Sequence, residues 1–261
     1  MGKSLLKVGK IQAMLDLDRI RAISLDLDDT LWPVLPTLKA AEAAQHRFLS
    51  EHAPATATLL QDKAVAGAIR QSVRDDFVHK AHDMTHFRQQ FIRRALLQAG
   101  EDEALVEPTF VQFYAARNQV TWFAEVEDSL AWLSARYPLV AVSNGNARLD
   151  WVGLAPWFAA CASAHEVGVA KPHVGIFTAA SQAIAVPLAA FLHVGDDAAL
   201  DVEGALACGM QAAWVQRQEL DYHQAAANAT QLQWPLASKA PQAMVRDLAD
   251  LCLLLGRADR G

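Results

Sequence analysis

Short apolar runs recur along this chain with the length of buried β-strands. They cover residues 20–25, 139–142, 191–194 and 212–215. Helix-like patterns over residues 175–185 and 200–208 separate the later runs. Strands that alternate with helices are typical of parallel βαβ units. The pattern therefore predicts an α/β fold with a parallel sheet.

Residues 36–123 have a different pattern, with helical periods and almost no strand signal. The clearest helix is predicted over residues 85–100, with Thr85 as its N-cap and Gly100 at its C-terminal stop. One face of that helix carries the apolar residues Phe87, Phe91, Ala95 and Leu96. We interpret the whole segment as an inserted all-helical domain.

The predicted domain organisation follows from this insertion. The α/β core takes residues 19–35 and 124–256, and the helical domain takes residues 36–123. The two hinges are expected at residues 33–36 and 122–126. Residues 216–241 are polar and irregular, which predicts a surface loop, and a last helix is expected over residues 242–255.

The first predicted strand ends in the run Asp26-Leu27-Asp28-Asp29-Thr30-Leu31-Trp32. Two carboxylates two residues apart then lie at the carboxyl edge of the sheet, where α/β folds bind ligands. Like charges this close repel, so the pair needs a cation, a shared proton, or both. One carboxylate can attack while the other moves a proton. The alternative is an Asx-turn or a helix N-cap.

The strand over residues 139–142 ends in Ser143-Asn144-Gly145-Asn146. A hydroxyl and backbone N–H groups after a strand offer donors to an anion. An ordinary strand-to-helix turn is the alternative interpretation.

Lys171-Pro172 precedes the helical segment at 175–185. Pro172 suits the first position of a helix, which would leave Lys171 at the mouth of the preceding loop. The alternative is a solvated surface lysine.

The strand over residues 191–194 ends in Gly195-Asp196-Asp197, and Asp201 follows five residues after Asp196. Carboxylates after a strand suit a hard cation such as Mg²⁺, which prefers oxygen ligands. In the alternative interpretation, Asp197 or Asp201 simply caps the following helix.

All four signals follow strands of one predicted parallel sheet, so they should converge at one edge of it. The acids would hold a metal, while the metal, Lys171, Ser143 and backbone N–H groups would hold an anion. Phosphoryl transfer requires this distribution, because its catalysis consists mainly of positioning and charge neutralisation. The site therefore predicts phosphoryl-transfer chemistry.

Composition limits the classes of partner and the cellular compartment that the sequence predicts. The chain has 261 residues, 52% of them hydrophobic, and a formal net charge of −6. An acidic chain without a long basic run is a poor candidate for binding nucleic acid or anionic membranes. The three cysteines are widely spaced, and the sequence has no sustained apolar signal region and no long apolar run. These features predict a cytoplasmic protein without a membrane span. The pattern does not indicate an oligomeric state.

With these motifs in this order, the chain resembles the haloacid dehalogenase superfamily of phosphatases from about Ile20 to Val215. The helical insert resembles the first cap type of that superfamily, and the core is expected to be Rossmann-like. The runs at 25–32, 142–147, 193–197 and 82–88 look most similar to bacterial phosphatases acting on FMN and on 5-amino-6-(5-phosphoribitylamino)uracil. The resemblance implies a small phosphorylated metabolite as substrate, with one of these two favoured.

The resemblance also implies residue roles. Asp26 is expected to be the nucleophile that becomes an aspartyl-phosphate. Asp28 is expected to protonate the leaving alkoxide and then to take a proton from water, and a crowd of acids around it would favour its protonated form. The Mg²⁺ ligands implied are Asp26, Asp196 and the backbone carbonyl of Asp28.

Other roles support this chemistry. Ser143, Asn144 and Lys171 are expected to bind the phosphoryl group, together with Thr30, which would also fix the turn that carries Asp28. Either Asp197 or Asp201 should orient Lys171 or a metal-bound water.

Substrate contacts are expected from the helical domain. The candidates are His82, Asp83, Thr85 and Arg88, with a solvated helix start as the alternative. Trp32 either stacks on an aromatic base or packs at the hinge. Competing activities are a phosphatase or phosphomutase acting on sugar phosphates or nucleotides, and a non-catalytic interaction protein is the third possibility. Dehalogenation needs no acid two residues after the nucleophile, so Asp28 argues against it.

Overall fold

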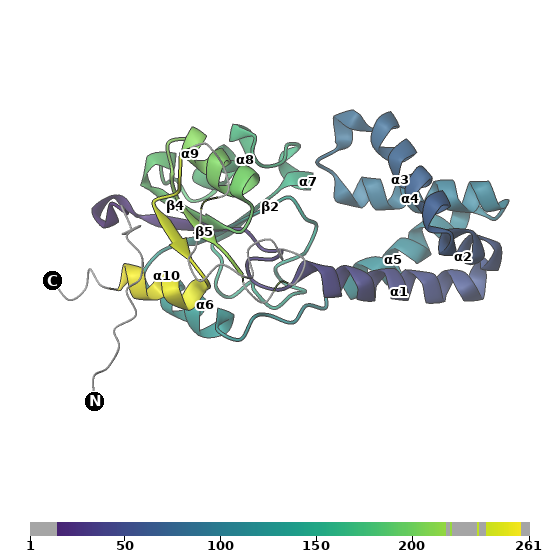
Figure 1. Ribbon diagram of the computed structural model, residues 1–261, viewed down its shortest axis with the longest axis horizontal. Coiled ribbons are helices and arrows are strands. Elements are labelled where there is room, and N and C mark those ends of the chain that lie inside the picture. The colour runs from purple at the N-terminus through teal and green to yellow at the C-terminus, as the bar shows by residue number, and fades with distance from the viewer. Residues whose placement is uncertain (1–14, 218–219, 221–233, 235–238, 257–261) are drawn as a thin grey trace.

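The computed structural model describes residues 15–217, 220, 234 and 239–256. Its centre is a parallel sheet of six strands in the order β3-β2-β1-β4-β5-β6 (Figure 1). The strands are β1 (Ala22–Leu25), β2 (Leu139–Ser143), β3 (Ala160–Ser163), β4 (Phe191–Gly195), β5 (Gln211–Val215) and β6 (Ala243–Val245). The prediction of an α/β fold with a parallel sheet is confirmed.

Helices cover both faces of this sheet, and the side chains of β1 alternate between the two. Ile23 and Leu25 pack toward α6 (Val126–Ser134) and α10 (Leu248–Leu255), whereas Ala22 packs toward α8 (Val174–Ala183) and α9 (Gly204–Ala207). A parallel strand buried on both faces has no polar side to present to water. This is why the strands appear in the sequence as continuous apolar runs.

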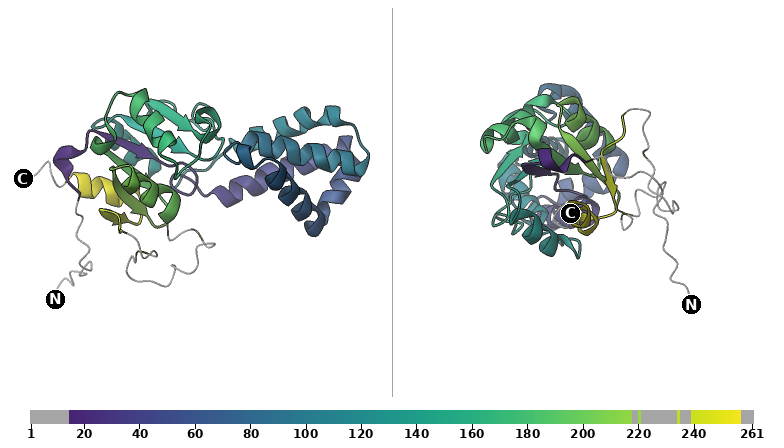
Figure 2. Two further views of the ribbon diagram at one scale, coloured as in Figure 1. Left: turned by 90° about the horizontal axis from the view of Figure 1, so that it is seen from above. Right: turned by 90° about the vertical axis from the view of Figure 1, so that its left-hand side faces the viewer.

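Five α-helices between β1 and β2 pack around a hydrophobic cluster of their own. They are α1 (Val34–His52), α2 (Pro54–Gln61), α3 (Lys63–Asp76), α4 (Met84–Ala99) and α5 (Val106–Arg117). Figures 1 and 2 show this helical segment extending to one side of the sheet, with α1 and α5 side by side. Helix α1 leaves the sheet and α5 returns to it. The division into domains at residues 35 and 124 stays a prediction.

Short helices complete the described part of the chain. They are α7 (Ala164–Val167), the 3₁₀ turns η1 (Leu17–Arg19), η2 (Val78–Lys80), η3 (Glu103–Leu105) and η4 (Leu188–Ala190), and η5 (Ala198–Glu203), which is a π-helix. The helix predicted over residues 200–208 is therefore a π-helix followed by α9. Such π-helical turns are frequent at functional sites.

The structure corrects one expected element and adds one strand that was not predicted. The helix predicted over residues 242–255 is the strand β6 followed by α10, because Ala243–Val245 pairs with β5 before the helix begins. The edge strand β3 was not predicted, since Ala-Cys-Ala-Ser contains no β-branched or aromatic residue that would mark a strand. Most of the loop predicted over residues 216–241 lies outside the described residues.

The N-terminus of α4 differs from the prediction by two residues. Asp83 is its N-cap, and its side chain accepts a hydrogen bond from the backbone N–H of His86. Thr85 lies inside the helix and not at the cap. The predicted stop is confirmed, since Gly100 has a φ of 73°, which suits glycine.

No helix in the described ranges is both long enough and apolar enough to cross a membrane.

The core packing predicts a contrast between two leucines of α10. Leu251 is fully buried, whereas Leu253 is 61% exposed. Leu251→Ala should lower the free energy of unfolding by roughly 2–5 kcal/mol because it opens a cavity. Leu253→Ala, the matched control, should change it by less than about 0.5 kcal/mol. Urea denaturation followed by circular dichroism measures both, and equal losses would contradict the packing described.

Candidate active site

The turn after β1 carries Asp26 to the carboxyl edge of the sheet. The backbone N–H of Asp26 still donates to Val194 of β4, at 2.9 Å, so its position is fixed by strand pairing. Asp29 adopts a φ of 57°, a conformation that Asp tolerates better than most residues, and its side chain accepts from the N–H of Val34. The chain therefore turns within a few residues from β1 into α1, with Asp26 left at the edge of the sheet.

Lys171 is buried between two carboxylates. Its Nζ donates to Asp26 Oδ1 at 2.5 Å and to Asp201 Oδ1 at 2.6 Å. The loop that carries the lysine is held by Asn144, whose amide exchanges two hydrogen bonds with the Lys171 backbone at 2.7 and 3.1 Å. Asn144 therefore positions the lysine, and its contact with a phosphate stays a prediction. The solvated-lysine alternative does not apply.

The prediction that Pro172 opens a helix is wrong. Helix α8 begins at Val174, and His173 is its N-cap, with a side chain that accepts from the N–H of Gly175. Lys171 thus lies in a loop between α7 and α8, held there by Asn144 and by its two carboxylates. The expectation that it follows a strand, as the other three signals do, is wrong, because the chain forms α7 after β3.

Asp201 is the fixed anchor of this cluster. Besides Lys171, its Oδ1 lies 3.1 Å from His193 Nε2, and its Oδ2 accepts from the backbone N–H of Asp197. A Cβ atom on Gly195 would lie 2.3 Å from Asp201 Oδ2, so only glycine lets the π-helix bring this carboxylate so close to β4. His193 is itself held by Ser24, its neighbour in the register of β1 and β4.

The two candidates for a supporting acid are separated by the structure. Asp201 contacts Lys171, whereas Asp197 caps η5, with its side chain accepting from the N–H groups of Ala199 and Leu200. Asp197 is thus a helix cap, which is the alternative interpretation given for it from the sequence.

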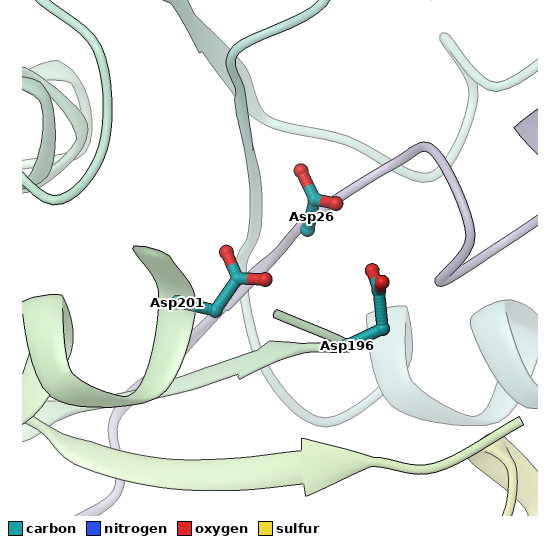
Figure 3. A group of neighbouring side chains, drawn as sticks. All are labelled: Asp26, Asp196 and Asp201. Atoms are coloured by element: carbon teal, nitrogen blue, oxygen red, sulfur yellow. The ribbon is translucent and has the colours of Figure 1, made fainter. Parts of the chain in front are cut away.

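Asp196 completes a group of three acids with Asp26 and Asp201, and Figure 3 shows the three carboxylates facing a common space. One oxygen from each lies within 4.8 Å of the others. Thr30 is fully buried and donates its hydroxyl to Asp196 Oδ1 at 3.0 Å. Thr30 therefore holds an acid of this group, a contact that differs from the phosphate contact expected of it.

Burial and mutual repulsion shift the proton affinities of these acids. Burial raises the pKa of Asp26 to about 7, with Asp201 and Asp28 adding to the rise and Lys171 opposing it. Burial, followed by repulsion from Asp26 and Asp201, raises the pKa of Asp196 well above its usual value. Although burial works against it, Lys171 and His193 hold the pKa of Asp201 below its usual value. The same two acids raise the pKa of Lys171 despite its burial.

The donor set fits a divalent cation. If all three carboxylates were ionised, the single ammonium would leave a net charge of 1 − 3 = −2, and this uncompensated repulsion adds to the raised pKa values of Asp26 and Asp196. Asp201 is already saturated by Lys171, His193 and Asp197, which leaves Asp26 and Asp196 as the available carboxylate ligands. Oxygen donors of this kind suit Mg²⁺.

Asp28 lies against an arginine that the sequence did not identify. Nη2 of Arg117, the last residue of α5, is 2.7 and 2.6 Å from the two oxygens of Asp28. The indole N–H of Trp32 donates to Asp28 Oδ1 at 2.9 Å. Only acids were expected around Asp28. The structure adds Arg117, an oppositely charged partner in direct contact with it.

Trp32 is fully buried in the core between sheet and hinge. It occupies the hinge-packing position, the second of its two predicted alternatives, and no face of its ring is open to a substrate.

A second arginine missed by the sequence reasoning braces the same turn. Arg217 donates to the backbone oxygen of Thr30 and to Glu125 Oε1, and its guanidinium lies 4.0 Å from the centre of the Phe123 ring. No spacing or motif marks Arg117 or Arg217, because both act through contacts across the fold.

Ser143 ends β2 beside β1, and its side chain is buried. A Cβ atom placed on Gly145 would lie 3.3 Å from Ser143 Oγ and 2.6 Å from Asp28 Oδ2. Glycine at this position lets the Ser143 loop approach Asp28, and the structure brings the first two sequence motifs together here.

The candidate residues at the start of α4 contact loops of the α/β core. Asp83 lies 3.1 Å from His165 Nδ1, and the hydroxyl of Thr85 accepts from the side-chain amide of Asn146. His82 is half-buried in the turn before the helix. These contacts place the start of α4 next to the loop that follows Ser143.

Arg88 lies one turn further into α4. It is 3.7 Å from Glu42, and its guanidinium lies 3.9 Å from the centre of the Phe113 ring. Burial lowers its pKa to about 10. Arg88 is therefore a largely buried cation within the helical segment, between α1 and α5.

Comparison with known families assigns the chain. The model of the haloacid dehalogenase-like hydrolases matches residues 20–209, which include all of the strand-end motifs. The chain belongs to this family. The predictions of the superfamily, of its Rossmann-like core and of an enzyme are confirmed by this match.

Curated relatives narrow the class. The chain is 33% identical, over 80% of its length and 88% of the relative's, to the 5-amino-6-(5-phospho-D-ribitylamino)uracil phosphatase YigB of Escherichia coli. It is also 31% identical to the phosphoserine phosphatase of Thermus thermophilus, over 50% of this chain and 55% of that one. With these relatives, the chain is classed as a phosphatase of the family, a phosphoric monoester hydrolase.

Solved structures share the fold. A 2-haloacid dehalogenase from Pseudomonas syringae superposes with a TM-score of 0.79 at 30% identity and covers 92% of this chain and 99% of its own. The HAD-hydrolase YfnB of Bacillus subtilis superposes with a TM-score of 0.58 at 22% identity, over 91% of this chain and 99% of that chain, which supports the fold alone.

The raised pKa values predict a pH-dependent effect of Mg²⁺ on stability. Without metal, the free energy of unfolding should fall as the pH rises from about 4 to about 7, because the unfolded chain releases the Asp26 proton first. Metal binds the deprotonated acids. In thermal unfolding, MgCl₂ should therefore stabilise more at about pH 7.5 than at about pH 5, by up to about 2.7 kcal/mol at a hundredfold excess over Kd.

Asp196→Asn is the control for this effect, because it removes one proposed ligand and keeps the shape of the side chain. An equal gain at both pH values, or an undiminished gain in Asp196→Asn, would contradict the metal site.

Proposed function

We propose that this protein is a Mg²⁺-dependent phosphomonoester hydrolase that acts through an aspartyl-phosphate on Asp26. The observation that carries the proposal is the contact of Lys171 Nζ with Asp26 at the end of β1, beside Ser143 and Asp28. A carboxylate at the edge of the sheet, with a cation on one oxygen, keeps its other oxygen for attack on phosphorus.

In the first proposed step, Asp26 attacks the phosphoryl group with the oxygen that Lys171 does not hold. The P–O bond to the alcohol breaks, its electron pair stays with the leaving oxygen, and Asp28 delivers a proton to that oxygen. Lys171 and the hydroxyl of Ser143 neutralise charge on the equatorial oxygens.

In the second proposed step, Asp28 takes a proton from the attacking water. The water oxygen bonds to phosphorus, and Asp26 leaves as a carboxylate. The same group serves as acid and then as base, because its proton is lost in the first step and regained in the second.

Asp26, Asp196 and the backbone carbonyl of Asp28 are the proposed Mg²⁺ ligands. The bound ion supplies charge neutralisation at the phosphoryl oxygens and lets two acids share one site. Asp201 remains with Lys171 and keeps its ammonium directed at Asp26.

The proposed substrate is a small phosphorylated metabolite, with FMN or 5-amino-6-(5-phosphoribitylamino)uracil favoured. The support is the likeness to a relative named as a phosphatase of the latter compound. We propose His82, Asp83, Thr85 and Arg88 as the residues that contact its distal part. Arg88 offers a cation among apolar rings, which suits a planar polar group.

A dehalogenase is the second candidate, because one structural neighbour at 30% identity is named a 2-haloacid dehalogenase. Halide leaves without a proton, so dehalogenation would not require Asp28 as an acid. The position of Asp28 beside the loop of Ser143, where a proton donor for a leaving alkoxide would lie, supports the phosphatase.

Asp26→Asn should abolish phosphate release from p-nitrophenyl phosphate, a loss of at least about 10⁴-fold, because the nucleophile is gone. Phosphate release measured with and without MgCl₂ tests this, and excess EDTA should stop the wild-type enzyme. Equal activity in wild type and Asp26→Asn would overturn the covalent route. A panel of FMN, sugar phosphates, nucleotides and 2-chloropropionate then separates the candidate substrates.

A further inference from the structure

The strongest unassigned feature of the site is the arginine at the end of α5. The side chain of Arg117 is 3% exposed, and both of its hydrogen bonds go to Asp28. Within the described residues, its buried Nη1 has no hydrogen-bond partner. Burying a guanidinium costs solvation free energy. Because the hydrogen bonds of this one go to a single carboxylate, its contacts bear on the position of Asp28.

Trp32 joins Arg117 in fixing the orientation of the Asp28 carboxylate. Oδ1 accepts from both Trp32 Nε1 and Arg117 Nη2, so two donors hold it. Oδ2 faces the Ser143 loop, where a Cβ atom on Gly145 would come within 2.6 Å of it. Arg117 Nη2 also donates to Oδ2, at 2.6 Å, so the arginine holds both oxygens, whereas Trp32 adds a second donor to Oδ1 alone. Oδ2 is therefore the oxygen with fewer donors, and it lies toward the loop that carries Ser143.

We propose that Arg117 is a positioning residue that aims Oδ2 of Asp28 at the leaving oxygen of the substrate. This inference rests on the proposed phosphatase function. Proton transfer requires donor and acceptor within hydrogen-bond distance, so a carboxylate free to rotate would lose part of its effect. Arg117 bridges both oxygens and Trp32 holds Oδ1, which together fix the plane of the carboxylate, and Oδ2 delivers its proton as the P–O bond breaks.

This assignment gives the helical segment a part in the chemistry. Arg117 belongs to α5, which returns from the helical segment, whereas Asp28 belongs to the turn after β1. The α5 helix also carries Phe113, one turn earlier, on which Arg88 lies. Helix α5 therefore contacts Arg88 through Phe113 and contacts Asp28, the proposed proton donor, through Arg117.

The test uses two substrates that differ in their leaving group. p-Nitrophenyl phosphate releases a stable phenolate, whereas benzyl phosphate releases an alkoxide that needs a proton. Asp28→Asn defines the effect of losing the proton donor. The quantity compared is kcat/KM, since it reports the steps up to the first irreversible bond cleavage and excludes hydrolysis of the intermediate.

For Arg117→Gln we expect kcat/KM to fall at least about tenfold more for benzyl phosphate than for p-nitrophenyl phosphate, which is part of the ~10²–10⁴-fold effect of a general acid. Trp32→Phe, which removes one donor and keeps an aromatic ring, should show a smaller difference of the same sign. Arg117→Lys, which keeps the charge and loses the fixed geometry, should fall between wild type and Arg117→Gln.

Arg94→Gln is the matched control, because Arg94 is a salt-bridged arginine of the helical segment that pairs with Asp76. Its kcat/KM should equal that of wild type on both substrates. Thermal unfolding checks that each variant folds, and Arg117→Lys carries the test if Arg117→Gln does not fold.

Equal losses on both substrates, or no loss, would overturn the role of Arg117 and leave the proposed function standing. A wild-type enzyme inactive on both phosphate esters in the presence of MgCl₂ would overturn the proposed function, and the inference with it.

Discussion

The ammonium of Lys171 holds the site together. It lies between Asp26 at the end of β1 and Asp201 in η5, at 2.5 and 2.6 Å, and all three side chains are nearly inaccessible to water. Removing one partner from such a buried group costs roughly 3–5 kcal/mol, because an uncompensated charge remains. Three strands therefore depend on one cation: β1 carries Asp26, β4 leads into η5 through Gly195, and the loop from β2 holds Lys171 through Asn144.

The charge of this cluster and the placement of the proton donor follow different constraints. Lys171 leaves the buried acids with excess negative charge, which suits a divalent cation. Asp28 is instead balanced by Arg117, from the helical segment. The proposed nucleophile is thus positioned by the sheet, whereas the proposed proton donor is positioned by a helix that also meets the proposed substrate site. This separation offers a physical route by which residues far from the phosphoryl group can affect proton transfer.

Much of this arrangement was predictable because it is local in sequence. Strand ends of a parallel sheet meet at one edge, so Asp26, Ser143 and Asp196 were expected together, and all three lie at the ends of β1, β2 and β4. Lys171 reaches Asp26 from a loop after α7 and not from a strand end. Predictions failed where a strand contains no β-branched or aromatic residue, as in β3, or where a long-range contact determines the partner. The roles of Arg117, Arg217 and His193 depend on packing between distant segments, and no spacing along the chain reveals them. Thr30 and Asn144 were found as site residues, but their partners, Asp196 and the Lys171 backbone, are visible only in three dimensions.

Direct detection of the covalent intermediate tests the central claim that Asp26 accepts the phosphoryl group. The enzyme is quenched in acid during turnover of p-nitrophenyl phosphate with MgCl₂, and its peptides are analysed by mass spectrometry. The account predicts a phosphoryl group on the peptide that contains Asp26, more of it in Asp28→Asn, where loss of the base slows hydrolysis, and none in Asp26→Asn. Phosphate release without any adduct at Asp26 in wild type or Asp28→Asn, or an adduct on another residue, would contradict it.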